Sequence, residues 1–236
     1  MKPISQAPNL SPVLRLMAAL FTGSLMLHAS AQDALRFEEE INAFREADAQ
    51  QPTQEGSLLF VGSSSIRMWQ TLEQAFPGHA TINRGFGGSH FSDALHWFDD
   101  LVPPHRPAAI FVYEGDNDTA SGKEPKHIVQ EAEQFLAKIR EVHPTVPVVF
   151  ISPKPSLKRW HLKAEYEATN TALLVLTHQH PNVYFADVWT ASLGFDGKPI
   201  PETFLDDELH MNDLGYIIWR NVLHDVMRTM QVHGLL

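Results

Sequence analysis

With 236 residues, 44% of them hydrophobic and 19% charged, the chain has the composition of one large globular domain or two small ones, not of a disordered segment. It contains no cysteine, which excludes disulfides, thiol nucleophiles, cysteine-ligated zinc sites and iron–sulfur clusters. Its 28 acidic and 18 basic side chains give a net charge of −10, which argues against binding to nucleic acid or to anionic lipid surfaces.

The first 31 residues have the layout of a signal peptide. Their charged side chains, Lys2 and Arg15, are basic, an apolar run spans 16–27, and Ala29-Ser30-Ala31 supplies the small residues of a cleavage site. The apolar run is shorter than the ~18 residues that a membrane-spanning helix needs, which disfavours an anchor. We therefore expect residues 1–31 to be removed on export to the periplasm or the exterior.

From residue 33 onward, helical patterns alternate with short apolar runs. An acidic stretch predicts an entry helix over 33–49. Runs typical of buried parallel strands occupy 57–62, 80–83, 108–113, 147–151 and 183–187. Further helical patterns occupy 66–75, 92–100, 125–142, 162–178 and 212–230. This alternation predicts one α/β domain over 32–236, with a five-stranded parallel sheet covered by helices on both faces.

In such a sheet, ligands bind beyond the carboxyl ends of the strands, so the residues after each apolar run are candidates for a site. Ser64 follows the first run by two residues and begins a helix, whose N-terminal amides favour negative charge. It is a candidate nucleophile, and a helix N-cap is its alternative role. Ser63 and Ser65 compete with it for either role.

Two later segments and one turn supply the other groups that a hydrolytic serine needs. Asp207 and His210 are three residues apart, which on a helical turn would place both side chains on one face, so that the carboxylate orients the imidazole. Gly88 and Asn117 follow the second and third runs and are candidate donors to an oxyanion, through a backbone N–H and a side-chain amide. An ordinary turn is the alternative role of each.

Together, and in this order, the segments resemble the four conserved blocks of the SGNH, or GDSL-type, esterases and lipases. The matching stretches are FVGSSSI at 60–66, NRGFGG at 83–88, GDND at 115–118 and DELH at 207–210. The resemblance spans 57–230 and implies a three-layer, doubly wound, flavodoxin-like SGNH hydrolase fold. One position departs from the pattern: Ser63 stands where the first block has Asp, a residue outside the catalytic triad.

The resemblance also implies the roles of the site residues. The nucleophile falls on Ser64, the base on His210 and the orienting acid on Asp207, while the oxyanion donors fall on Ser64, Gly88 and Asn117. It implies a serine esterase that needs no cofactor and no metal. The substrate expectation comes from the chain itself: its connections are short, and the longest irregular stretch, 189–206, is charged, so we expect small acyl, acetyl-type esters to be preferred over long-chain lipids. The expected partner is a small-molecule ester, with no nucleic acid and no stable membrane insertion after removal of the signal peptide.

Several alternatives remain open. An acyltransferase or a lysophospholipase-type lipase could use the same triad, and a binding module could keep the fold without the chemistry. A metal site on Asp206, Asp207 and His210 is disfavoured, because no second histidine cluster accompanies it. The loop 153–160 carries cations and an indole and either lines the substrate pocket or only precedes the next helix. A groove of three indoles, Trp69, Trp97 and Trp160, would favour longer acyl chains.

We expect the exported protein to begin at or near Gln32, because the small-residue segment before it follows a short apolar run. The intact mass of the exported protein measures this directly. Recovery of the chain in a membrane fraction with residues 1–31 still attached would contradict it.

Overall fold

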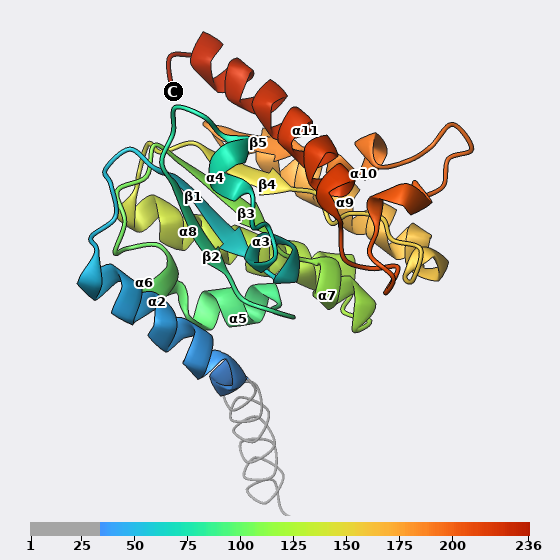
Figure 1. The fold of residues 1–236 in the computed structure, drawn as a ribbon, viewed down its shortest axis with the longest axis horizontal. Helices are drawn as coiled ribbons and strands as arrows, with labels where there is room; N and C mark the ends of the chain where they lie inside the picture. Colours follow the sequence, from blue (N-terminus) through green and yellow to red (C-terminus); the bar gives the residue numbers. More distant parts are fainter. Residues whose placement is uncertain (1–33) are drawn as a thin grey trace, which may run out of the picture. The chain divides into compact units, whose positions relative to one another are not determined.

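The computed structural model describes residues 34–236, so the predicted signal peptide lies outside the described residues. Within them, five parallel strands form a sheet in the order β2-β1-β3-β4-β5 (Figure 1). The strands are β1 (Leu58–Gly62), β2 (Thr81–Gly85), β3 (Ala109–Tyr113), β4 (Val148–Ile151) and β5 (Val183–Ala186). This is the flavodoxin-like order, in which the chain changes direction of travel across the sheet between β1 and β3. The predicted fold class is confirmed.

The register of the central strands brings their carboxyl ends to one level. Gly62, the last residue of β1, lies opposite Gly85 of β2 and Tyr113 of β3. The segments that leave these three strands therefore begin side by side, at the switch point where ligands bind in doubly wound sheets.

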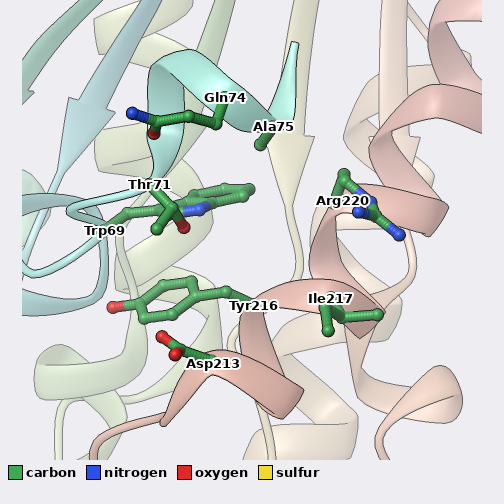
Figure 2. Close-up of a pocket in the computed structure, with 8 residues that line it drawn as sticks. All are labelled: Trp69, Thr71, Gln74, Ala75, Asp213, Tyr216, Ile217 and Arg220. Atoms are coloured by element: carbon green, nitrogen blue, oxygen red, sulfur yellow. The ribbon is translucent and has the colours of Figure 1, made fainter.

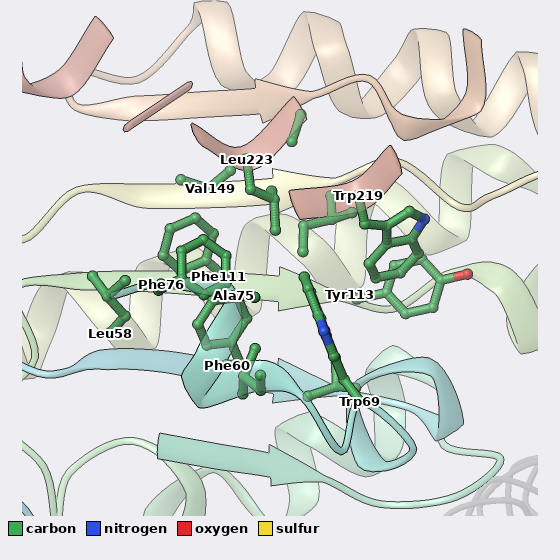
Figure 3. Packing of buried hydrophobic residues seen from close by; sticks show 14 of the residues in the cluster. Leu58, Phe60, Trp69, Ala75, Phe76, Phe111, Tyr113, Val149, Trp219 and Leu223 are labelled. Atoms are coloured by element: carbon green, nitrogen blue, oxygen red, sulfur yellow. The ribbon is translucent and has the colours of Figure 1, made fainter. Parts of the chain in front are cut away.

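One face of the sheet is covered by α3 (Ser64–Arg67), α4 (Leu72–Ala75) and α11 (Asp213–Val232) (Figure 1). Aromatic side chains join these helices to the strands (Figure 3). Phe60 stacks on Phe111 with ring centroids 4.5 Å apart, and Trp219 lies 4.7 Å from Tyr113 and 6.0 Å from Trp69. Because α3 and α11 share this core, the segments at their N-termini are held relative to each other.

The opposite face carries α2 (Glu38–Gln50), α5 (Phe91–His96), α6 (Phe98–Leu101), α8 (Pro125–Val142) and α9 (Lys163–His178). Side chains alternate along a strand, so Phe150 of β4 faces this layer while Val149 faces the first. Phe91 of α5 packs against Phe150, with ring centroids 6.4 Å apart. Shorter elements are α7 (Asp116–Ala120), α10 (Val188–Ala191) and 3₁₀ turns at Leu35–Phe37, Trp160–Leu162 and Pro201–Thr203. None of the helices within 34–236 combines the length and the apolar composition of a membrane span.

The predicted elements match the observed ones most closely where apolar patterning is strong. All five strands lie within two residues of their predicted bounds, and the helix predicted at 125–142 has those bounds. The prediction of one continuous helix at 66–75 and another at 92–100 is wrong, because two short helices occupy each segment. A buried indole, Trp69 or Trp97, lies at each break. The chain turns there to bury a large side chain that a continuous helix would direct elsewhere.

Gly85 allows α3 to approach β2, and its replacement tests how tight that contact is. A Cβ at Gly85 would lie 2.2 Å from the backbone nitrogen of Arg67. We expect Gly85→Ala to lower the free energy of unfolding by about 3 kcal/mol, because backbone atoms must shift to make room. Gly78→Ala is the control, since its Cβ meets nothing within 4 Å. Its left-handed φ of 89° is the one source of strain and should lower the free energy of unfolding by about 1 kcal/mol. Equal losses in urea unfolding of the two variants would contradict the close approach.

Candidate active site

Among the three consecutive serines, the hydroxyl of Ser64 is the one that faces a histidine. Ser63 occupies the N-cap position of α3 but makes no side-chain capping bond, and Ser64 is the first helical residue. The Oγ of Ser64 lies 3.1 Å from Nε2 of His210. Ser65 is buried, and its carbonyl accepts a hydrogen bond from the hydroxyl of Tyr216. The helix start thus directs the middle hydroxyl into the site.

The other ring nitrogen of His210 contacts Asp207. Its Nδ1 lies 2.5 Å from Oδ2 of Asp207. The second oxygen of that carboxylate, Oδ1, accepts hydrogen bonds from the backbone nitrogens of Leu209 and His210, at 3.0 and 2.9 Å. The expected helical turn is wrong, because Glu208 has a φ of 59° and α11 begins only at Asp213. An aspartate that bonds to the backbone two and three residues ahead favours a turn over a helix.

The environment of Asp207 keeps its carboxylate ionised. Burial acts to raise the pKa, but hydrogen bonds from the ring and backbone of His210 and from the backbone of Leu209 outweigh it and lower the pKa of Asp207 to about 2. An ionised acceptor fixes the proton of the imidazole on Nδ1 and leaves the lone pair of Nε2 directed at Ser64. With both ring nitrogens engaged, the alternative of a metal site on Asp206, Asp207 and His210 loses its histidine ligand. Residues 34–236 contain no group of three or more potential metal ligands.

The structure brings Gly88 and Asn117 to the same pocket as Ser64 and His210. The pocket has a volume of about 270 Å³. Gly88 has a φ of 81°, a left-handed conformation that glycine adopts without strain. Within the described residues, the backbone N–H groups of Ser64 and Gly88 donate to no protein acceptor. Both therefore remain available to a ligand.

The amide of Asn117 has a fixed orientation. Its Oδ1 accepts a hydrogen bond of 3.1 Å from Nη2 of Arg159, and its Nδ2 donates to the carbonyl of Ser89 at 3.0 Å. A cation can only donate, so it holds the oxygen of the amide on its own side and turns the Nδ2 group away. One N–H of Nδ2 is then left for a ligand in the pocket.

A buried carboxylate, Asp116, lies beside this amide and collects four donors. Its Oδ1 accepts from Arg159 and from the hydroxyl of Tyr166, both at 2.6 Å. Its Oδ2 accepts from the hydroxyl of Tyr113 at 2.7 Å and from Lys154 at 3.3 Å. Burial acts to raise the pKa of Asp116, but the two cations and the two phenols outweigh it and hold the pKa well below its usual range.

A second buried carboxyl, Glu114, supports the turn that carries Gly88. The Oγ of Ser89 lies 2.6 Å from Oε1 of Glu114 and 3.1 Å from the carbonyl oxygen of Phe86. Burial raises the pKa of Glu114 well above its ordinary value, and the carboxylate of Asp118 raises it further. A neutral carboxyl can donate to Ser89, which frees the single hydroxyl proton of Ser89 for Phe86. The backbone carbonyl of Ser89 accepts a hydrogen bond from the amide of Asn117. Glu114 therefore contributes to the placement of both candidate oxyanion donors, the N–H of Gly88 and the amide of Asn117.

A second pocket, of about 230 Å³, lies between α4 and α11 and contains none of these groups. Figure 2 shows Trp69 above Tyr216, with Asp213 and Arg220 on α11. The ring centroids of Trp69 and Tyr216 are 5.1 Å apart. No serine or histidine lines it within the described residues, so the hydrolytic groups are confined to the first pocket.

Sequence reasoning missed the partners that hold the candidate residues in place. It assigns no role to Glu114 or Asp116, although both lie in the segment that directly follows the third predicted strand. It considered the loop 153–160 as a pocket wall, and the structure places Lys154 and Arg159 of that loop in the lining. A charged residue directly after a fully buried strand was the available signal, since burial forces such a group to find partners.

Glu114→Gln tests whether the buried carboxyl is neutral. A group with a raised pKa in the folded state stabilises the protein fully below its ordinary pKa of 4.5, and this contribution is lost as pH rises toward the folded-state pKa. We expect the free energy of unfolding of Glu114→Gln, relative to wild type, to increase between pH 5 and pH 8, because an amide does not titrate. Urea unfolding at both pH values measures it. Glu114→Ala is the contrast: it should lose about 1–3 kcal/mol relative to wild type at pH 5, since Ser89 loses its partner, and this loss should shrink toward pH 8 as the wild type itself loses stability. A difference between Glu114→Gln and wild type that does not change with pH would contradict a neutral Glu114.

Comparison with known proteins places this geometry in a family. Residues 55–218 match the GDSL-like Lipase/Acylhydrolase family. Solved structures of similar fold include a GDSL-like lipase from Bacteroides thetaiotaomicron, at 18% identity over 84% of this chain and 98% of that chain, with a TM-score of 0.65. A family 3 carbohydrate esterase from Talaromyces cellulolyticus has 18% identity over 75% of this chain and 98% of that chain, with a TM-score of 0.58.

An acetylxylan esterase from Geobacillus stearothermophilus, solved as a catalytic mutant, has 13% identity over 72% of this chain and 94% of that chain, with a TM-score of 0.60. The search of curated proteins gave no match. At these identities the structural likeness establishes the fold, while the family match covers most of the chain. The chain belongs to the GDSL-like lipase/acylhydrolase family and is a hydrolase of carboxylic esters with the SGNH fold.

Proposed function

We propose that this chain is a serine esterase that hydrolyses small acyl, acetyl-type esters, with Ser64 as nucleophile, His210 as general base and Asp207 as orienting acid. The observation that carries the proposal is the continuous hydrogen-bonded path from Asp207 through His210 to Ser64. It joins residues 146 positions apart in the chain and has the geometry of a serine triad. We also propose that the reaction takes place outside the cytoplasm, because residues 1–31 have the layout of a signal peptide.

In the proposed reaction, Oγ of Ser64 attacks the carbonyl carbon of the ester while Nε2 of His210 takes the hydroxyl proton. The carboxylate of Asp207 stabilises the imidazolium that forms. The negative oxygen of the tetrahedral intermediate accepts hydrogen bonds from the free backbone N–H groups of Ser64 and Gly88 and from the remaining side-chain N–H of Asn117.

His210 then gives its proton to the leaving alkoxide, and an acyl group remains on Ser64. Water attacks this acyl-enzyme, with His210 again as base, and the acyl group leaves as a carboxylic acid while Ser64 regains its proton. Oγ of Ser64 and Nε2 of His210, between which the first proton moves, lie within hydrogen-bond distance of each other. No step needs a cofactor.

The size and the lining of the pocket support a small acyl group. Polar and charged side chains surround the 270 Å³ space, whereas a long acyl chain needs an apolar groove. The three indoles that could form such a groove lie apart. Trp69 is buried in the core beneath α11, Trp97 contacts His96, and Trp160 stacks on Trp189 at 5.9 Å. The fold shared with an acetylxylan esterase is consistent with an acetyl-type substrate.

We expect Ser64→Ala to lower kcat for 4-nitrophenyl acetate by about 10⁴-fold or more, because loss of a triad nucleophile removes acyl transfer. Ser65→Ala is the matched control and should keep most of the activity, since its hydroxyl is buried away from His210. Labelling by a fluorophosphonate should follow the same pattern. Equal losses in the two variants, with unchanged melting temperatures, would contradict the assignment of Ser64.

We expect the rate to be highest for acyl groups of two to four carbons in a series of 4-nitrophenyl esters from two to sixteen carbons. Leu209 is the one aliphatic side chain among the described residues that line the pocket, so the lining offers no apolar groove to stabilise a longer chain. The measurement is kcat/KM for each ester at concentrations below micelle formation. A maximum at ten carbons or beyond would contradict the small-acyl specificity but not the triad.

A further inference from the structure

Cations outnumber acids in the lining of the candidate active site. Among the described residues that line it, Arg67, Lys154 and Arg159 are basic and Asp116 is the acid. The lining therefore has three basic side chains and one acidic side chain, in a chain whose net charge is −10, and the carboxylate of Glu40 lies 3.7 Å from Arg67 outside that lining. An excess of buried or half-buried charge of one sign lowers the stability of the folded protein unless a ligand of the opposite charge compensates it.

Lys154 has donor capacity that the protein does not use. Its side chain is 2% exposed, and its ammonium contacts one acceptor among the described residues, Oδ2 of Asp116 at 3.3 Å. That oxygen also accepts the hydroxyl of Tyr113. An ammonium has three N–H donors, so two remain without a protein acceptor among the described residues.

Arg67 is the second available cation. Its guanidinium lies against the backbone of Gly87, where an added Cβ would meet Cζ of Arg67 at 2.7 Å. The carboxylate of Glu40 is 3.7 Å away, which is beyond hydrogen-bond distance, and the side chain is 51% exposed. Arg67 therefore lies beside the turn that carries Gly88 with its donors facing the pocket and the solvent. Arg159, in contrast, is occupied by Asp116 and Asn117.

We propose that the substrate carries an anionic group, of the carboxylate type, which binds to Lys154 and Arg67 in this pocket while its ester carbonyl faces Ser64. This proposal rests on the proposed esterase function and names the substrate class of the same site. The developing oxyanion already has three neutral donors, Ser64, Gly88 and Asn117, so the cations are not needed to complete that set. A fixed anion on the substrate uses the free N–H donors and neutralises the excess charge.

The test compares two matched pairs of esters on the wild-type protein. 4-Acetoxybenzoate and its methyl ester place or remove an anion on the alcohol side, while 4-nitrophenyl hydrogen succinate and 4-nitrophenyl butyrate do so on the acyl side. We expect the anionic member of one pair to have a kcat/KM about tenfold higher than its neutral partner, after correction for the uncatalysed rates. The pair that shows the preference tells which side of the ester the cations bind.

Two variants assign the preference to the proposed residues. Arg67→Gln and Lys154→Met should each reduce the anion preference, the ratio of kcat/KM for the anionic ester to that for the neutral ester, to about threefold or less, chiefly through the KM of the anionic ester. Arg220→Gln on α11, which lines the other pocket, is the matched control and should leave the preference unchanged. If Lys154→Met does not fold, because Asp116 has lost a cation, the exposed Arg67 still decides the outcome.

The outcomes separate the two proposals. Equal rates for anionic and neutral esters, or a preference that survives Arg67→Gln, would overturn the anion site and leave the esterase function intact. If the wild type hydrolyses none of the four esters and takes no fluorophosphonate, the esterase function fails. Calorimetric binding to Ser64→Ala then decides the anion site. Tighter binding of 4-acetoxybenzoate than of its methyl ester, lost on adding Arg67→Gln, supports the site, and equal binding overturns it.

Discussion

The buried carboxylate of Asp116 is the interaction on which the candidate site depends. An ionised group in this position is stable only while its partners remain, and removal of one partner of a buried ion pair typically costs about 3–5 kcal/mol. Those partners come from three places: Tyr113 ends β3, Lys154 and Arg159 lie in the segment after β4, and Tyr166 lies on α9. One carboxylate thus ties together the strand ends that form the pocket. Because Arg159 also binds the amide of Asn117, the same ion pair fixes a candidate oxyanion donor.

The segment that carries His210 is held in a different way, by the start of α11. The side chain of Asn212 accepts the backbone N–H of Leu214 and donates to the carbonyl of Phe204, so the helix start and the preceding loop are joined by one residue. The backbone N–H of Leu205 donates to the carbonyl of His210 at 2.8 Å, which closes the loop around Asp207. Packing of Trp219 in the core then sets the position of the whole segment relative to α3 and Ser64.

Sequence alone predicted those parts of the fold and site that depend on local patterns. The strands are continuous apolar runs between turn residues, and the five candidate site residues each follow a strand or precede the last helix, so their meeting at one sheet edge follows from the parallel order. The DELH segment was read as a helical turn, because spacing alone does not reveal that the carboxylate of Asp207 bonds to the backbone ahead of it. The contacts of Asp116 with Arg159 and Tyr166 could not be predicted from the sequence, since they join side chains 43 and 50 positions apart and produce no periodic pattern of residue types.

Glu114 and Asp116 show how neighbouring carboxyls serve different purposes in one site. They are two residues apart, and burial acts to raise the pKa of both. Cations and phenols outweigh burial at Asp116 and lower its pKa, whereas the acids Asp118 and Asp93 add to the effect of burial at Glu114. The raised pKa of Glu114 favours its neutral form, which would add no negative charge beneath the turn of Gly88. An ionised Asp116 holds the cations in place but neutralises only part of their charge. More basic than acidic side chains therefore line the pocket, although the chain as a whole is acidic, so the net charge of a chain does not predict the charge of its site.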